Sequence, residues 1–552
     1  MNAASAGAGP RWLKSRAPLI ALATTVALAV AYAIVEPRTA DLAAATFRAD
    51  LWEAQGFVVF NEAWYSGHTV PGYSLLYPPL GALVGPVPIL IGSAIAAVLC
   101  FSQLAARAFG GTAWLGILWF GLAATVAMWG GRVPFALGLA IGLGALLALQ
   151  RGRPVLACAL AALTAPASPV AGLFLALAAA AVAVAGRLRL PPAKEPGEGM
   201  PTGAALAVAV CAFVPTALLG LVFPTDGYEP FRLWAYLWLM GAAVALIALV
   251  PADRPVLRWG GVLYLLLGTV AFVLYTPLGD NAVRLGYTFA GPLLAMALVA
   301  TRPRLLLLLA LPLLYWQWTA TANDVYYGLS SPTGEAAFYA PLLAALDEEV
   351  GTAPVRIHIP PTRTRWEAVH VGESYPLARG WLRQLESDDF RLFREGRLDV
   401  AGYREWLTEH GVSYVALTRA SELDYLARDE ADLLESGALP YMREVYADDD
   451  WTLWKVEPEP GAGATALAGP GARITELEPD AYSVAVEGPG SYELRIRYEP
   501  WQRVVAGAGC IEPGPDDLST TLLVDGKGPA TIRVETRLSA DALLGTVPGC
   551  VG

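Results

Sequence analysis

Several ionisable side chains follow the first long apolar segment of the chain, within residues 36–79. Asp41 and Asp50 are carboxylates that could remove a proton, and His68 could orient a hydroxyl group. Arg48 lies between the two aspartates and carries the planar guanidinium that suits a phosphate. We therefore expect Asp41 and His68 to be catalytic, and Arg48 and Asp50 to bind substrate.

A purely structural role is the alternative for Asp41. The segment 36–79 is long for a connector, which favours a functional or structured loop. Residues 40–60 have the pattern of an amphipathic helix at the membrane interface, with Leu, Phe and Trp toward lipid. Asp41 would then open this helix, where a carboxylate stabilises the N-terminal dipole.

The aromatic residues of the same segment also have two interpretations. Trp64 and Tyr73 would stack on sugar rings, but rings of this kind also anchor loops at a membrane surface without any ligand. His68 could likewise be an ordinary surface histidine. We expect all three to wall a substrate site.

Two other loops supply matching polar groups. Arg132 stands in "WGGRVPF", and Arg284 follows Asp280 and Asn281 in "YTPLGDNAVRLGYTFAGP". A single arginine at a membrane boundary often reaches for lipid head groups. Two arginines beside carboxylates on one face are better explained by a bound phosphate, so these four residues join the expected substrate site.

Composition indicates which elements must position these residues. The chain has 552 residues, of which 55% are hydrophobic and 16% charged. Up to Ala320 there are 18 Lys and Arg against 11 Asp and Glu, a net of +7; the remainder has 20 against 38, a net of −18. This pattern is typical of a polytopic membrane domain followed by an acidic, water-soluble part, which disfavours nucleic acid as a partner.

The membrane domain is expected over residues 1–320, with about eleven transmembrane helices. The first apolar run follows Arg11, Lys14 and Arg16 and is longer than a usual signal core, which favours a retained anchor over a cleaved signal peptide. Further runs span about 79–105, 112–130, 134–150, 155–165, 168–186, 203–222, 231–250, 257–275, 284–300 and 304–320. We expect a hairpin or broken helix around "TAPASP".

Basic residues predict the orientation of these spans. With a cytoplasmic N-terminus, the cytoplasmic loops hold Arg107, Arg151, Arg153, Arg187, Arg189, Lys194, Arg254, Arg258, Arg302 and Arg304. The opposite loops hold Arg38, Arg48, Arg132, Arg232 and Arg284. By the positive-inside rule, the protein is predicted to lie in the plasma membrane with its C-terminal domains outside the cytoplasm.

The C-terminal part reads as two domains. Residues 321–458 alternate helical segments with the strand-like "VRIHIP", "SYVALT" and "WTLWKVE", which predicts an α/β domain. Residues 459–472 are rich in Gly, Ala and Pro and read as a linker. Residues 473–552 show short alternating strands, which predict a β-sandwich of a shape common in carbohydrate-binding modules. Cys510 and Cys550 could form a disulfide there in an oxidising compartment.

No motif of a soluble enzyme is present. The sequence lacks a Walker A loop, an HExxH motif, a GxSxG elbow and a Cys/His cluster with zinc spacing. No metal ligand or cofactor can be named, and the requirement for a divalent metal stays open. Chemistry is therefore expected where polar residues meet the membrane.

The order of these parts resembles one family. A charged N-terminus, one span, a long acidic external loop, about ten further spans and an exported C-terminal part resemble the GT-C integral-membrane glycosyltransferases. The stretches "GHTVPGYSLLYPPL" and "DNAVRLGYTFAGPL" are similar to motifs of uncharacterised actinobacterial multi-pass membrane proteins, and "YPLARGWLRQLE" and "YREWLTEHGVSYVAL" to exported regions that follow such cores. The resemblance implies a polyprenyl-phosphate sugar donor and an essential carboxylate in the first external loop. Asp41 matches that position, but the compact Asp-Glu pair of some members is missing, so Asp50 stays open as the base.

The expected function is transfer of a sugar from this lipid-linked donor to an extracytoplasmic glycan or other cell-envelope acceptor. Asp41 would take the acceptor's proton, and Arg284 or Arg132 would stabilise the departing phosphate. A multi-pass transporter is the first alternative, since proline-broken helices often frame transport sites. A non-catalytic cell-envelope assembly protein is the second, and it would leave Asp41 and His68 dispensable. The lack of an internal repeat, and charges that gather at the external loops, favour the enzyme over the transporter.

Overall fold

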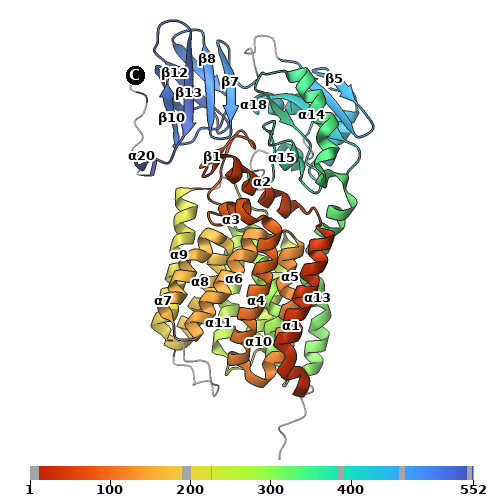
Figure 1. The fold of residues 1–552 in the computed structure, drawn as a ribbon, viewed down its shortest axis with the longest axis vertical. Coiled ribbons are helices and arrows are strands. Elements are labelled where there is room, and N and C mark those ends of the chain that lie inside the picture. Colours follow the sequence, from red (N-terminus) through yellow and green to blue (C-terminus); the bar gives the residue numbers. More distant parts are fainter. Residues whose placement is uncertain are drawn as a thin grey trace, which may run out of the picture. The chain divides into compact units, whose positions relative to one another are not determined.

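A computed structural model describes residues 11–188, 201–224, 227–382, 384–385, 391–394, 396, 398–458, 466–543 and 550. The chain forms two compact units, coloured by sequence in Figure 1. The membrane unit comprises Met1–Ala54 and Gly72–Tyr326, and the tail unit comprises Gln55–Pro71 and Tyr327–Gly552. The middle of the expected external loop 36–79 thus belongs to the tail unit. The boundary expected at Ala320 falls six residues later, inside a helix.

Apolar helices make up most of the membrane unit and lie side by side as a bundle (Figure 1). Each apolar run expected from the sequence overlaps a helix: α1 (Arg11–Val35), α4 (Pro86–Phe109), α5 (Ala113–Trp129), α6 (Val133–Gln150), α7 (Pro154–Ala167), α8 (Pro169–Arg187), α9 (Thr202–Val222), α10 (Leu233–Leu249), α11 (Pro255–Val273), α12 (Val283–Leu298) and α13 (Pro303–Ser330). Among the described residues, seven candidate spans are long and apolar enough to cross a membrane, and one of them covers α4 and α5 together. The protein is therefore a helical membrane protein, while eleven crossings remain a prediction.

Close helix contacts hold α5, α12 and α13 together. A β-carbon on Gly291 of α12 would lie 2.5 Å from the ring of Trp119 on α5, so the absent side chain lets the two helices approach. The indole N–H of Trp119 donates to Gln317 of α13 at 3.1 Å, and the Gln317 amide donates to the carbonyl of Tyr287 on α12 at 2.7 Å. This buried chain of hydrogen bonds fixes the relative positions of three helices that carry the candidate site.

The break expected near "TAPASP" is present. Ser168 lies between α7 and α8 in an extended conformation, with φ −160° and ψ 114°, and its hydroxyl accepts from the N–H of Ala171. The carbonyl of Pro166, which the break leaves without a helical partner, accepts from the N–H groups of Leu75 and Leu76 at 2.8 and 2.9 Å. Ser74 donates to the carbonyl of Ala167 at 2.9 Å, so the segment after the expected external loop closes this helix end.

The first part of the tail unit is an α/β domain, as expected. Its sheet has the order β3-β4-β6-β5, and only β3 and β4 run parallel because helices connect them. The strands are β3 (Arg356–His358), β4 (Val412–Thr418), β5 (Met442–Ala447) and β6 (Trp451–Val456). The helices include α14 (Ala336–Val350), α15 (Glu367–His370), α17 (Arg391–Arg394), α18 (Val400–Glu409) and α19 (Arg428–Glu435).

The second part is a β-sandwich. One sheet has the order β10-β13-β8-β7 and the other β11-β12-β9, and residues of both sheets form one apolar core. The strands are β7 (Ala472–Glu478), β8 (Ala481–Val486), β9 (Gly490–Leu494), β10 (Gln502–Ala506), β11 (Gly509–Pro513), β12 (Thr520–Val524) and β13 (Ala530–Thr536). The short helix α20 (Ala540–Leu543) follows them.

Two predictions concern the edges of the sandwich. Cys510 and Cys550 are joined in a disulfide, with 5.8 Å between their α-carbons, which confirms the predicted pairing. Of the linker expected over 459–472, residues 459–465 lie outside the described part of the chain. Its last part is no linker, because Leu467 and Ala468 are buried in the sandwich core.

Candidate active site at the Asp41–Arg132 ion pair

Arg132 directly follows a tight turn that requires glycine. It precedes α6 and follows Gly130 and Gly131, the second of which has φ +74°. A β-carbon on Gly131 would lie 2.4 Å from the hydroxyl oxygen of Thr39, which itself donates to the carbonyl of Gly130 at 3.1 Å. The missing side chain therefore lets the start of α2 (Ala40–Gln55) sit directly on the turn that carries Arg132.

The guanidinium of Arg132 joins three helices. Its Nε donates to Asp41 Oδ2 on α2 at 2.9 Å, and its Nη2 donates to Asp324 Oδ2 on α13 at 3.1 Å. Its Nη1 donates to Thr321 Oγ1, one turn earlier on α13, at 3.2 Å. Burial alone would lower the pKa of Arg132, but Tyr287, Asp41 and Asp324 reverse this and raise that pKa above its ordinary value. Arg132 is therefore a permanent cation at the centre of the cluster.

Asp41 belongs to this cluster rather than to a helix cap. In the first turn of α2, the N–H groups of Leu42 and Ala43 donate to the backbone carbonyl of Thr39. Among the described residues, the Asp41 side chain makes one hydrogen bond, which it accepts from Arg132. This side chain is 15% exposed. Its second carboxylate oxygen is thus open to a substrate hydroxyl, which is what a general base requires.

Tyr73 lies near four charged residues of the site. Its side chain is half-buried, and the loss of solvent around the hydroxyl raises the pKa of that group. Arg48, Arg284 and Arg132 oppose this rise and Asp41 adds to it, so all four charges lie close enough to act on one phenol. The structure therefore brings together five of the residues singled out from the sequence.

Arg48 contributes a second, buried guanidinium. Its Cζ lies 3.9 Å from the centre of the Tyr73 ring, and its Nη1 donates to the carbonyl of Ala44 at 2.8 Å. Burial lowers the pKa of Arg48, while the nearby Tyr73 and Tyr77 act in the opposite direction. The cation is thus held rigidly on α2 beside the tyrosine.

Arg284 is the third guanidinium, and within the described residues no carboxylate pairs with it. It lies in the first turn of α12, with its Cζ 5.4 Å from the centre of the Phe135 ring in the first turn of α6. Three arginines against Asp41 and Asp324 leave the cluster with a net charge of +1. The N-terminal dipoles of α6 and α12 add to this positive field, so the cluster can hold an anion.

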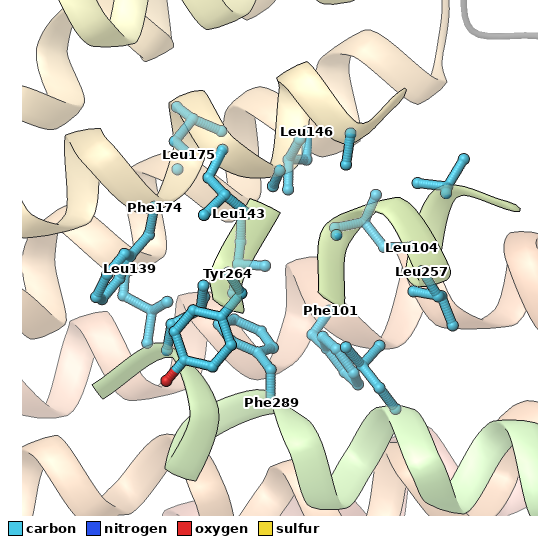
Figure 2. Close-up of a pocket in the computed structure, with 18 of the residues that line it drawn as sticks. Phe101, Leu104, Leu139, Leu143, Leu146, Phe174, Leu175, Leu257, Tyr264 and Phe289 are labelled. Carbon is cyan, nitrogen blue, oxygen red and sulfur yellow. The ribbon is translucent and has the colours of Figure 1, made fainter. Parts of the chain in front are cut away.

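Phe135 is one of the residues that line an apolar cavity of about 290 Å³. Figure 2 shows other residues of its wall. Among its lining residues only Gln150 and Tyr264 have polar side chains, and the hydroxyl of Tyr264 is occupied by the backbone of α12. The remaining walls are aliphatic and aromatic side chains of α4, α6, α8, α11 and α12, including Phe101, Leu104, Leu139, Leu143, Leu146, Phe174, Leu175, Leu257 and Phe289. A dry cavity of this size can take branched hydrocarbon, since about half this volume suffices for benzene.

Three polar residues of the site were missed in the sequence. Thr321 and Asp324 lie just beyond the last apolar run, where the membrane domain was expected to end. Helix α13 continues to Ser330, because no proline lies between Pro312, inside the helix, and Pro332, just after it. The signal that the sequence offered was Asp324 itself, which is the first carboxylate after that apolar run. The hydroxyl of Tyr287 is buried without a hydrogen-bond partner among the described residues, and nothing in the sequence distinguishes it.

The other expected site residues lie elsewhere. Asp50 is further along α2 and acts on Tyr77 rather than on Tyr73. Asp280 and Asn281 form a 3-10 turn directly before α12 and Arg284. Trp64 and His68 belong to the tail unit, where their rings stack with centroids 5.2 Å apart and both are buried. They are therefore not surface anchors, and a catalytic role for His68 stays a prediction.

The expected orientation of α2 toward lipid is wrong for Leu42 and Phe47, whereas Leu51 and Trp52 are half-buried. Leu42 and Phe47 are buried by protein. A β-carbon on Gly131 would lie 2.7 Å from Leu42 Cβ, which shows how closely the turn before α6 covers this helix. Leu42 and Phe47 thus pack against protein, and this packing holds α2 where Asp41 can pair with Arg132.

Within the part of the chain that the structure describes, no group of three or more His, Cys, Asp and Glu residues could hold a metal ion. No model of a known protein family matches the chain, and comparison with curated proteins finds no match either. Function must therefore be argued from the site itself.

Proposed function

We propose that this protein is a membrane glycosyltransferase that takes a sugar from a polyprenyl-phosphate donor and transfers it to an extracytoplasmic glycan or other cell-envelope acceptor. The observation that carries this proposal is that Asp41, with an open carboxylate oxygen, and Arg284, which has no carboxylate partner among the described residues, both lie close enough to act on Tyr73. The Phe135 ring under Arg284 also lines an apolar cavity. A base, an anion site and a hydrocarbon site are the three things that this reaction requires.

Each part of the cluster has a step in the reaction. The acceptor hydroxyl attacks the anomeric carbon of the donor sugar, and Asp41 takes the hydroxyl proton as the new C–O bond forms. The bond between that carbon and the phosphate oxygen breaks, and the electron pair leaves with the polyprenyl phosphate. Arg284 and the helix N-termini stabilise the charge that develops on this phosphate. Arg132 holds Asp41 in position and stays bound to it throughout.

The cavity suits the lipid part of the donor. Phe135 lines the cavity and also lies under Arg284, so an anionic head group at Arg284 would have its hydrocarbon chain beside the cavity. The cavity walls offer hydrocarbon contacts with almost no polar atoms, which matches an isoprenoid chain. The described arrangement also favours Asp41 over Asp50 as the base, because Asp41 contacts Arg132.

The transporter is less well supported. The broken helix between α7 and α8 is a feature that it predicts. However, the freed carbonyl groups of Pro166 and Ala167 accept hydrogen bonds from Ser74, Leu75 and Leu76, so these two groups are occupied and do not face a transported solute. An assembly protein would use the ion pair of Asp41 only for stability, and variants at Asp41 separate that possibility from the enzyme.

Transfer assays test the proposal. Purified protein in liposomes is incubated with a panel of labelled polyprenyl-phosphate sugars and a cell-envelope extract as acceptor. We expect one donor to yield labelled glycan and free polyprenyl phosphate. Binding of the donors without any transfer, in protein that also moves no solute across the vesicle membrane, would point to the assembly role.

The proposed reaction side also requires a defined orientation. Reporter fusions at Glu335 should give an extracytoplasmic signal, and fusions at Pro191, which lies outside the described residues, a cytoplasmic one. Identical signals at both positions would contradict the proposed topology.

A further inference from the structure

The segment Gln55–Pro71, which we call the strap, is built into the tail unit although the chain enters and leaves it from the membrane unit. Its strands β1 (Phe60–Asn61) and β2 (His68–Thr69) pair with each other as a short hairpin. The residues between them make the contacts to the rest of the tail unit. The strap is therefore more than a connector between two helices.

The strap adds an edge to the sheet of the α/β domain. Trp64 forms a parallel bridge with Leu377, which in turn bridges to Ile357 of β3. The N–H of Leu377 donates to the carbonyl of Ala63 at 2.8 Å, and the N–H of Tyr65 donates to the carbonyl of Leu377 at 3.1 Å. These backbone bonds fix the register of the strap.

Trp64 is the main side-chain anchor. It is fully buried, and its indole N–H donates to the carbonyl of Ala368 at 3.0 Å. Gly380 packs against it so closely that a β-carbon there would lie 2.4 Å from Trp64 Cγ. A buried tryptophan with this fit is among the strongest anchors a segment can have.

The same strap also contacts the β-sandwich. The N–H of Glu62 donates to the carbonyl of Pro479, between β7 and β8, at 2.8 Å. The N–H of Arg497, after β9, donates to the carbonyl of Ser66 at 2.8 Å. The strap thus joins both domains of the tail unit.

Backbone strain indicates that the surroundings impose this conformation. Tyr65, Ser66 and Gly67 are consecutive residues with φ of 58°, 61° and 112°. Left-handed conformations cost energy for residues other than glycine and persist only where the surroundings enforce them. The bonds on both sides of this tight corner supply that enforcement.

Both ends of the strap continue directly into the candidate active site. Gln55 is the last residue of α2, the helix that carries Asp41 and Arg48. Pro71 is followed by Gly72 and then by Tyr73, whose ring lies under Arg48. Tyr73 is therefore two residues from the strap, whereas Asp41 and Arg48 are connected to it through the helix α2. A change in how the tail unit holds the strap would reach Tyr73 directly, and would reach Asp41 and Arg48 as a shift of α2.

We propose that the strap is a positioning element through which the tail unit sets the geometry of Asp41, Arg48 and Tyr73, with Trp64 as its key positioning residue. The catalytic consequence rests on the proposed glycosyltransferase function, whereas the mechanical coupling does not. A misplacement of about 1 Å at a reacting group can reduce turnover by about 10²-fold, so the tail unit would be required for full activity.

A glycine outside both the strap and the site provides the test. Gly380→Ala places a methyl group against Trp64, whereas the matched control Gly488→Ala, also in the tail unit, meets nothing within 4 Å. We measure hydrogen–deuterium exchange over α2 and residues 72–84, together with turnover. Gly380→Ala should raise exchange there about tenfold and lower turnover by about 10²-fold, and Gly488→Ala should change neither.

A second variant covers the case in which Gly380→Ala unfolds the tail unit, visible as fast exchange throughout β3–β6. Four residues, Gly-Ser-Gly-Ser, are inserted after Gln55, which is exposed and precedes the first strap contact. This insertion loosens α2 while every bond of the strap stays intact. Raised exchange in α2 with an unchanged tail unit supports the coupling; wild-type exchange in α2 in this variant overturns it. If wild-type protein shows no sugar transfer, the proposed function fails while the exchange data still decide the coupling.

Discussion

Each of the two units contains a buried ionic cluster, and the two clusters differ in access. In the tail unit, Glu430 accepts hydrogen bonds from His358 at 2.6 Å, Tyr403 at 2.8 Å and Arg379 at 3.4 Å. The side chains of His358, Glu430 and Arg379 have no exposed surface. Burial opposes the charge of Glu430, but His358, Arg379 and Tyr403 hold its pKa below the ordinary value.

The cluster of the membrane unit is more open. The side chains of Arg132, Asp41 and Asp324 are 10%, 15% and 30% exposed. Arg284 stands nearby without a carboxylate partner in the described residues. A cluster without exposed surface is closed to a substrate and contributes to the stability of the fold, whereas a partly exposed cluster with an open carboxylate oxygen can bind and react. The comparison thus supports a stabilising role for Glu430 and leaves Asp41 accessible for the chemistry of the proposed function.

The largest expected effect is on the closed cluster. Glu430→Ala leaves His358 and Arg379 buried without their counter-charge, so the free energy of unfolding of the tail unit should fall by about 3–5 kcal/mol. Denaturant unfolding followed by exchange within the tail unit measures this loss. Glu435→Ala is the control, because it lies on the same helix α19 but its ion pair with Arg419 is exposed and is worth at most about 1 kcal/mol. Equal losses in both variants would contradict the closed-cluster interpretation.

In the cluster of the membrane unit, a substitution should lower turnover rather than stability. Asp41→Asn keeps the shape and removes the basic group, so turnover should fall by at least about 10²-fold, or about 2.7 kcal/mol in barrier height, with unfolding unchanged. Turnover is measured on the labelled donor identified in the transfer assay. Asp50→Asn is the matched control on α2 and should retain activity. Loss in the Asp50 variant alone would move the base there, and wild-type turnover in the Asp41 variant would remove the assignment.

A smaller effect is expected at Arg284, which has no carboxylate partner among the described residues. Arg284→Ala removes the charged partner of the donor phosphate, so Kd for the donor should rise about tenfold or more. Arg284→Lys should restore part of the affinity, because the charge returns without the planar fork. Arg302→Ala, which changes an exposed arginine beyond the other end of α12, should bind as the wild type does. Unchanged binding after Arg284→Ala would show that the phosphate is held elsewhere.

The effect that is smallest per unit of the measured variable concerns a buried acid that belongs to neither cluster. Burial raises the pKa of Glu62 in the strap to about 8, despite the opposing charges of Arg356 and Arg497. The folded protein therefore holds a proton that the unfolded chain releases near pH 4.5, and stability falls as pH rises from that value to about 8. The loss is at most about 1.4 kcal/mol per pH unit. Glu62→Gln should flatten this slope in unfolding measured between pH 6 and pH 8, and a slope equal to that of the wild type would show that Glu62 is already ionised.

The sequence alone determined the local elements. Apolar runs predicted the helices of the membrane unit, and alternating residues predicted strands such as β4, β6, β8, β12 and β13, because these patterns depend on neighbours two to four positions apart. It also identified Asp41 and Arg48 as charged residues of the long first external loop, Arg132 and Arg284 as arginines at the ends of apolar runs, and Tyr73 as an aromatic residue that could stack on a sugar.

Only the tertiary structure decided which of these residues meet. Asp41 and Arg132 are 91 positions apart, and Arg132 and Asp324 are 192 apart, so no local pattern could pair them. Hydropathy also ended the membrane domain before Asp324, because a helix can continue past the point where its sequence stops being apolar. The strap shows the same limit: Trp64 and His68 follow a membrane helix in sequence but are buried in the tail unit, since burial is decided by packing partners more than 300 residues away.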